Sequence, residues 1–209
     1  MIDPTHFLVF LTAATLLAIV PGPGMLYVLA RTLAGGRREG LLSSIGTFFG
    51  GMVHVFAAAA GVSIILAKSA LAFSLVKYLG AAYLCFLGIR MLVDARRDEA
   101  ISPLTASRAK NPFWQGVMTE VLNPKTAFFF LSFIPQFVNH ENGHVFAQFV
   151  LLGAISVTLN TAVDIIVTLL AGPLGRRIRE SARFRRRQRT VTGMVMIGLG
   201  TYLAVGESN

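Results

Sequence analysis

Long apolar runs of helical length constrain this chain more than any other feature of its sequence. Six can be read, at about residues 5–30, 41–67, 71–93, 113–138, 145–171 and 190–206. A helix that crosses the roughly 30 Å hydrocarbon core of a bilayer needs about 20 apolar residues. Only 14% of the residues are charged, and the mean hydropathy is +0.65, so a soluble domain would lack polar surface. We therefore predict an all-α integral membrane protein with six transmembrane helices.

The basic residues predict how these helices are oriented. Most of the 19 Lys and Arg residues lie in the first, third and fifth connections, whereas the second holds Lys68 and the fourth, "NHENGH", holds none. Cytoplasmic loops carry the excess of Lys and Arg, so both termini are predicted on the outer side. The cluster "RFRRRQR" at 183–189 favours topology and contact with anionic lipids over nucleic acid, which is not expected as a partner.

Proline interrupts the first and the fourth apolar run. The interruptions consist of Pro21, Gly22, Pro23 and Gly24 in the first run and of Asn123, Pro124 and Lys125 in the fourth. Proline inside a helix frees the carbonyl four residues back, and an unpaired carbonyl is costly in hydrocarbon. A single proline is often an ordinary kink. Two matching interruptions instead point to a transport path.

The six runs divide into two halves of one transmembrane domain, at about 5–93 and 113–206. Because each half has an odd number of spans, the second half must cross the membrane in the opposite direction to the first. The third runs of both halves are rich in glycine, "GAAYLCFLGIRML" and "GMVMIGLGTYL". We predict a 3+3 inverted repeat in which helices 1 and 4 are broken by proline.

Several polar side chains are expected at membrane depth. Lys125 should face the interior with an acidic partner, Glu120 or Asp164, either as an ion pair that closes the bundle or as a contact for a zwitterion. His54 is either a proton carrier or a neutral hydrogen-bond donor between helices. Asn160 is expected to form an interhelical hydrogen bond. These side chains are candidates for an ion pair or for ion coupling.

The sequence lacks the patterns of an enzyme or a redox protein. It contains no GxSxG or P-loop motif, and Cys85 is its one cysteine. The stretch HENGH at 140–144 has the letters of HExxH, but it lies in the fourth connection near the outer surface, where solvation explains these residues. Neither a metal nor a cofactor is therefore expected. The alternative function is a non-transporting membrane protein, such as a thiol carrier or an intramembrane enzyme. The single cysteine and the missing catalytic motifs disfavour it.

The sequence resembles the LysE-type translocators, the lysine exporter and homoserine/threonine resistance family. The resemblance rests on PGPG, on "KYLGAAYLCFLGIRML" (77–92) and on "NPFWQGVMTEVLNPKTAFFFLSFIPQFV" (111–138), and it extends over about 4–206. It implies a secondary transporter in the bacterial inner membrane that exports amino acids or similar small metabolites, as a proton antiporter and a homo-oligomer. Residues 21–24 and 123–125 match the family's motifs. The exported metabolite stays open.

Overall fold

A computed structural model describes residues 4–68, 70–97, 111–139, 143–171 and 181–205. The described residues are almost entirely helical, and no strand occurs among them, which confirms the predicted all-α class. The elements are α1 (Pro4–Ile19), α2 (Pro23–Lys68), α3 (Ala70–Arg97), α4 (Pro112–Val121), α5 (Pro124–Phe128), the π-helix η1 (Phe129–Phe133), the 3₁₀-helix η2 (Ile134–Phe137), α6 (Val145–Leu169) and α8 (Ala182–Val205).

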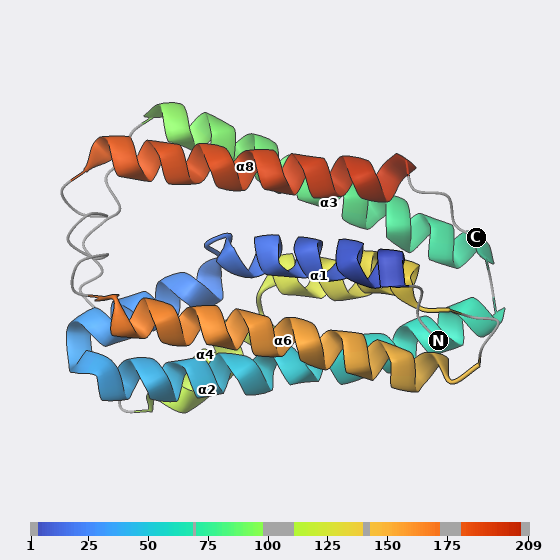
Figure 1. Ribbon diagram of the computed structural model, residues 1–209, viewed down its shortest axis with the longest axis horizontal. Helices are drawn as coiled ribbons and strands as arrows, with labels where there is room; N and C mark the ends of the chain where they lie inside the picture. Colours follow the sequence, from blue (N-terminus) through green and yellow to red (C-terminus); the bar gives the residue numbers. More distant parts are fainter. Residues whose placement is uncertain (1–3, 69, 98–110, 140–142, 172–180, 206–209) are drawn as a thin grey trace.

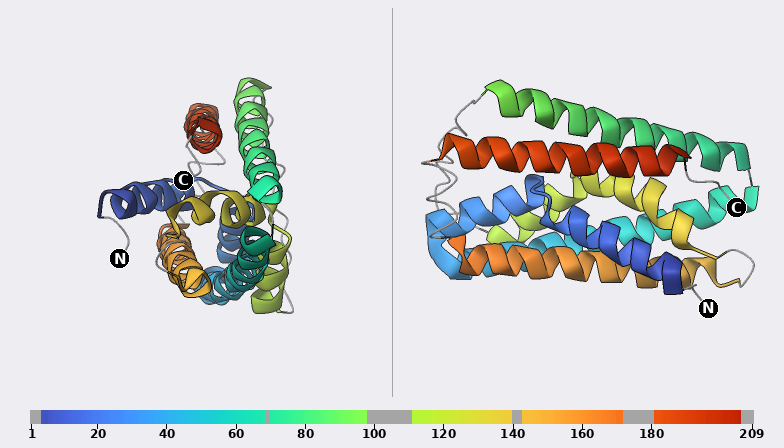
Figure 2. Two further views of the ribbon diagram at one scale, coloured as in Figure 1. Left: turned by 90° about the vertical axis from the view of Figure 1, so that its right-hand side faces the viewer. Right: turned by 45° about the horizontal axis from the view of Figure 1, so that its top comes forward.

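The helices lie along one axis and alternate in direction (Figure 1). α1, α3 and α6 run one way, and the long second part of α2, the segment from α4 to η2 and α8 run the other way, so that both termini lie at one end. α3 and α8 pack on each other beside the remaining helices (Figure 2). By length and composition, two described helical stretches could cross a membrane, Pro23–Gly61 and Val145–Leu169, and His6–Ile19 is a shorter apolar helix.

Both predicted interruptions are present in the backbone. α1 ends at Ile19 and α2 begins at Pro23, while α4 ends at Val121 and α5 begins at Pro124. The fourth run is more irregular than predicted, because the short α5 passes into a π-helix and then a 3₁₀-helix. Both proline-led helices begin with a residue whose missing N–H costs nothing at a helix start.

Helix extends further into two of the predicted connections than the apolar runs indicate. α2 continues through the first connection, including Arg31 and Arg37, and α8 already begins at Ala182, directly before the arginine cluster. The stretch between residues 24 and 40 contains no proline, so nothing removes a backbone donor there. The chain changes direction at Gly36 instead, with φ 80° and ψ −176°, a conformation that is essentially restricted to glycine.

Replacing Gly36 with alanine should therefore destabilise the protein. A Cβ in this backbone conformation costs on the order of 1–3 kcal/mol. Gly61→Ala is the matched control on the same helix, because a Cβ added at Gly61 meets nothing within 4 Å. Thermal unfolding in detergent should show a lower midpoint for Gly36→Ala only. Equal midpoints for both variants would contradict the strain argument.

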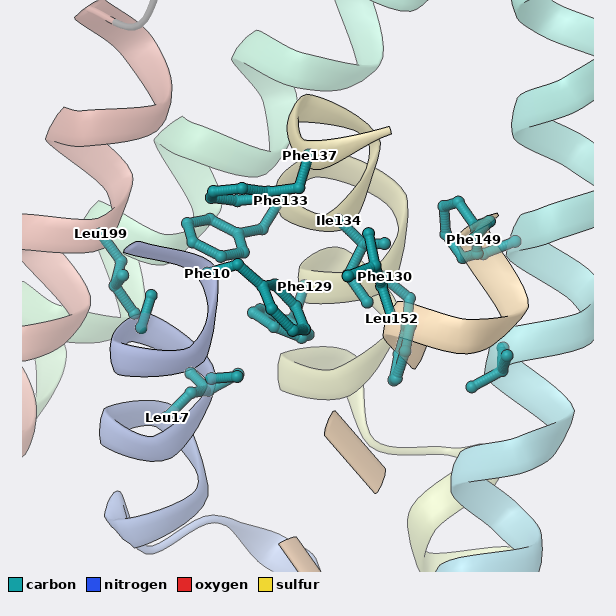
Figure 3. Close-up of a cluster of buried hydrophobic side chains, with 14 of the residues drawn as sticks. Phe10, Leu17, Phe129, Phe130, Phe133, Ile134, Phe137, Phe149, Leu152 and Leu199 are labelled. Atoms are coloured by element: carbon teal, nitrogen blue, oxygen red, sulfur yellow. The ribbon is translucent and has the colours of Figure 1, made fainter. Parts of the chain in front are cut away.

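A cluster of buried aromatic side chains holds the broken segments in place (Figure 3). The rings of Phe129, Phe133 and Phe137 follow one another at centroid distances of 5.1 and 4.9 Å. Phe10 of α1 packs on Phe137 at 5.5 Å, and Phe149 of α6 lies in the same cluster. Such ring pairs add to the energy of burial. The cluster thereby fixes α1 and α6 against η1 and η2, beside the two breaks.

Candidate functional site

Lys125 connects the two proline breaks. Its side chain is 7% exposed, and Nζ donates hydrogen bonds to the carbonyl oxygens of Val20 at 3.0 Å and Leu17 at 3.3 Å. Leu17 is the residue four positions before Pro21, so its carbonyl has lost its usual helical donor. The ammonium group from the second break therefore replaces a donor that the first break removed.

The second break has a corresponding arrangement. Pro124 cannot donate to the carbonyl of Glu120, which instead accepts from Asn123 N at 3.0 Å and lies 2.9 Å from His54 Nε2. A carbonyl only accepts, so Nε2 carries the hydrogen in this contact. The imidazole also stacks on the ring of Phe130. His54 thus acts as a hydrogen-bond donor between helices, which is one of the two roles expected for it.

The carboxylate of Glu120 is enclosed by polar groups. Oε1 accepts from Thr126 Oγ1 at 2.6 Å, and Oε2 accepts from Asn123 Nδ2 at 3.1 Å. Asn123 also caps α5, because its Oδ1 accepts from Lys125 N at 3.1 Å. Gly24 faces this carboxylate so closely that an added Cβ would overlap Oε2. A side chain at Gly24 would therefore push the Glu120 carboxylate out of this position.

Lys125 does not form the expected ion pair with a carboxylate of the described residues. Its Nζ is bonded to the α1 carbonyls, the oxygens of Glu120 are bonded to Thr126 and Asn123, and Asp164 Oδ2 contacts Thr47. Both acids still act on Lys125 electrostatically. The physical reason is that the end of α1 presents free carbonyls and the negative end of a helix dipole, which together attract a cation.

A small cavity of about 30 Å³ lies between these groups. It has room for about one or two water molecules. Its polar lining consists of Thr47, Glu120, Lys125, Thr126, Ser156 and Asn160, and its apolar lining comes from α1, α2, η1 and α6. Within the described part of the chain, no hydrogen bond involves the amide of Asn160, so the expected interhelical bond is not formed. The amide instead borders the cavity.

The predicted residues discussed next do not line the cavity. Pro23 and Pro124 are exposed and Pro21 is half-buried, so they shape the chain rather than line the cavity. A Cβ added at Gly22 would lie 3.0 Å from Lys125 Nζ. Asp164 lies behind Thr47, outside the lining.

Sequence reasoning missed three hydroxyl residues of the lining, Thr47, Thr126 and Ser156. Their signal was weak, because isolated Ser and Thr residues are ordinary in membrane helices, where they can bond to their own backbone. Thr126 directly follows the Asn-Pro-Lys interruption. That position was the one available indication.

Comparisons with known proteins match this chain over nearly its whole length. A family model described as LysE type translocator matches residues 15–207. An uncharacterized membrane protein of Vibrio cholerae is 34% identical over 97% of this chain and 98% of its own length. A leucine efflux protein of Klebsiella pneumoniae is 27% identical over 97% and 96%, respectively. No solved structure matches. The chain therefore belongs to the LysE-type translocator family, and it is a membrane transporter rather than an enzyme.

Proposed function

We propose that this protein is a secondary transporter that exports amino acids or similar small metabolites across the bacterial inner membrane. One observation carries the proposal: both proline breaks meet at a single buried cavity that presents an ammonium and a carboxylate group. Relatives named leucine efflux proteins support an amino acid as the cargo. Broken helices whose ends face a central site are typical of secondary transporters.

The cavity offers complementary groups to a zwitterion. Lys125 would turn from the α1 carbonyls towards a substrate carboxylate, and Glu120 would accept from a substrate ammonium. Phe129, Phe130 and Val157 supply apolar contacts for a side chain. A volume of about 30 Å³ is too small for an amino acid, so the surrounding helices must move apart when substrate enters. Rocking of one half against the other would expose the site to each side in turn.

Reciprocal contacts between α2 and α6 support an inverted repeat. A Cβ added at Gly51 would lie 3.0 Å from Cγ2 of Val157, and one added at Gly153 would lie 2.7 Å from Cγ1 of Val55. Each helix therefore presents a glycine to a valine of the other helix. The same sequence separation joins Gly51 to Gly153 and Val55 to Val157. A twofold axis that exchanges the two halves produces this pattern.

α3 and α8 make a second reciprocal contact. A Cβ added at Gly88 would lie 2.6 Å from the carbonyl oxygen of Gly193, and one added at Gly193 would lie 2.7 Å from that of Gly88. Gly88 also faces Ile197, and Gly193 faces Leu92. These are the third helices of the two halves, which an inverted 3+3 arrangement pairs across the same axis. Both pairs therefore favour this arrangement.

The positions of the basic residues support the proposed orientation. The turn within α2, the end of α3 and the start of α8 lie at the same end of the bundle, opposite the termini (Figure 1). The arginines that adjoin this turn and these helix ends are exposed: Arg37, Arg38, Arg96 and Arg183. By the positive-inside rule this end faces the cytoplasm, and both termini face outwards. We further propose that the protein is a proton antiporter, that it contacts membrane lipids and that it forms a homo-oligomer.

The proposal predicts exchange of leucine in proteoliposomes. Vesicles loaded with unlabelled leucine should take up labelled leucine, and the initial rate should saturate. Pro23→Ala restores an N–H that can bond back to Ile19 and close part of the break, so exchange should fall by roughly tenfold or more, the effect of about 1.4 kcal/mol. Pro112→Ala is the matched control, since Pro112 also begins a helix but belongs to neither of the two proline breaks.

Exchange at background level by the unmodified protein, for leucine and for a panel of other amino acids, would contradict the proposed transport function. Uptake that rises in proportion to concentration would indicate a channel. Equal exchange by Pro23→Ala and Pro112→Ala would show that the first break is not needed for transport. Protein abundance in the vesicles is measured in each case, so that rates compare equal amounts.

A further inference from the structure

Asp164 of α6 is a buried acid next to the cavity but outside it. Its side chain is fully buried, with 0% of its surface exposed. Oδ2 lies 3.0 Å from Thr47 Oγ1, and Oδ1 has no hydrogen-bond partner among the described residues. Thr47 itself lines the cavity. The hydroxyl of Thr47 therefore stands between the acid and the space where substrate would bind.

The two hydrogen-bond contacts of the Thr47 hydroxyl indicate whether Asp164 carries a proton. Thr47 Oγ1 lies 2.9 Å from the carbonyl oxygen of Ser44 and 3.0 Å from Asp164 Oδ2. A hydroxyl has one hydrogen, and the Ser44 carbonyl can only accept. If Asp164 is ionised, one of these contacts has no hydrogen. If Oδ2 carries a proton, Asp164 donates to Thr47 and Thr47 donates to Ser44, so both contacts are satisfied.

The surroundings of Asp164 provide no direct counter-ion. Glu120 from α4 and Lys125 from α5 act on it electrostatically, but neither forms an ion pair with it within the described part of the chain. On α2, Glu39 and His54 each lie about two turns from Thr47, and His54 Nε2 is bonded to the Glu120 carbonyl. An ionised carboxylate buried without a paired cation is costly. A bound proton removes this cost.

A row of buried polar groups, called the polar seam below, extends from Asp164 towards the turn at Gly36. On α2 it contains Ser44 and Ser43, both fully buried. Further along, Thr32 Oγ1 lies 3.4 Å from Thr168 Oγ1 of α6. At the Gly36 turn the seam reaches the Arg31–Glu39 ion pair, with 3.9 Å between Nη1 and Oε2. These hydroxyls place polar atoms along a helix contact that apolar side chains would otherwise fill.

We propose that Asp164 is the binding site of the coupling proton, separate from the substrate cavity, and that Thr47 links the two sites. This proposal rests on the proposed function, because it names the residue that couples proton movement to export. When the proton on Oδ2 leaves for water along the polar seam, the Thr47 hydrogen turns from the Ser44 carbonyl to the carboxylate. The hydroxyl then presents a different face to the cavity. Substrate binding and proton binding thereby influence each other.

The test compares two measurements on the same proteoliposomes. One is leucine exchange without a pH gradient, and the other is leucine accumulation driven by a pH gradient. Asp164→Asn should lower the ratio of gradient-driven to exchange rates by about tenfold or more, within the usual range of coupling between sites. Thr47→Val should lower the same ratio, because it removes the linking hydroxyl. Thr161→Val is the matched control, since that hydroxyl bonds to its own helix at the Val157 carbonyl.

Three results would contradict the proposal. A ratio in Asp164→Asn equal to that of the unmodified protein overturns it. If His54→Gln lowers the ratio and Asp164→Asn does not, His54 is the carrier and the proposal is wrong. If Asp164→Asn does not fold, an unchanged ratio in Thr47→Val overturns the coupling role.

A second readout needs no substrate and separates this proposal from the proposed function. Infrared difference spectra of the purified protein at low and high pH should contain a carboxylic acid band that Asp164→Asn lacks. If leucine exchange fails but this band is present, transport of leucine is wrong while Asp164 still binds a proton. If exchange succeeds and the band is the same in both proteins, Asp164 is not the proton site.

Discussion

Replacing Lys125 with methionine should reduce amino-acid export by roughly 10- to 100-fold, the effect of losing a hydrogen bond from a charged donor worth about 1.5–3 kcal/mol. Methionine keeps much of the length of the lysine stem but cannot donate, so the Leu17 and Val20 carbonyls lose the ammonium partner that they have in the structure. The cavity also loses its positive charge. Initial rates of exchange per inserted protein measure this effect.

Lys77→Met is the matched control for Lys125→Met. Lys77 is also a buried lysine, 4% exposed, but it lies on α3 and does not line the cavity. A general intolerance of buried lysine substitutions would lower export in both variants equally. The role assigned to Lys125 requires a much larger loss at Lys125, and equal losses would contradict it.

Replacing Gly24 with alanine should have a comparably large effect. The new Cβ would overlap Glu120 Oε2, so the carboxylate must leave Asn123 and Thr126, to which it is bonded at 3.1 and 2.6 Å. Leaving such buried groups without partners costs about 1–3 kcal/mol. We expect a lower unfolding midpoint in detergent and a loss of export of roughly tenfold or more.

Two comparisons test the cause of the Gly24 effect. Gly61→Ala introduces the same change on the same helix at a position where the Cβ meets nothing within 4 Å, so its unfolding midpoint should not fall. In a double-mutant cycle, Glu120→Ala removes the group with which the new Cβ collides. The stability penalty of Gly24→Ala should then largely disappear. A penalty that persists in the Glu120→Ala background would show that another contact is responsible.

The positions of the breaks could be predicted from the sequence, and the partners of the freed carbonyls could not. Pro21 and Pro124 lack an N–H wherever they lie, so local chemistry predicts that helices are interrupted near them. The side-chain donors to the two carbonyls, Lys125 and His54, are 108 and 66 positions away from them. An acid was expected beside Lys125, but the carbonyl end of α1 serves as its partner.

The backbone of the first connection is another feature that the sequence did not predict. Arg31, Arg37 and Arg38 indicate a polar segment at one end of the bundle, and charge patterning predicts only on which side of a membrane such a segment lies. It does not distinguish a loop from a helix that turns sharply. Gly36 permits a backbone conformation that other residues avoid, and α2 can therefore change direction without a loop.

The sequence by itself determined the helical class, the places where α1 and α4 end, and the separation of basic and apolar segments. These properties follow from local causes: apolar length, missing backbone donors and charge distribution. Only the tertiary structure decided that both breaks enclose one cavity, that Lys125 caps α1 and that Thr47 meets Asp164 across 117 positions. Such contacts depend on how whole helices pack, and no pattern within a single helix specifies its partner.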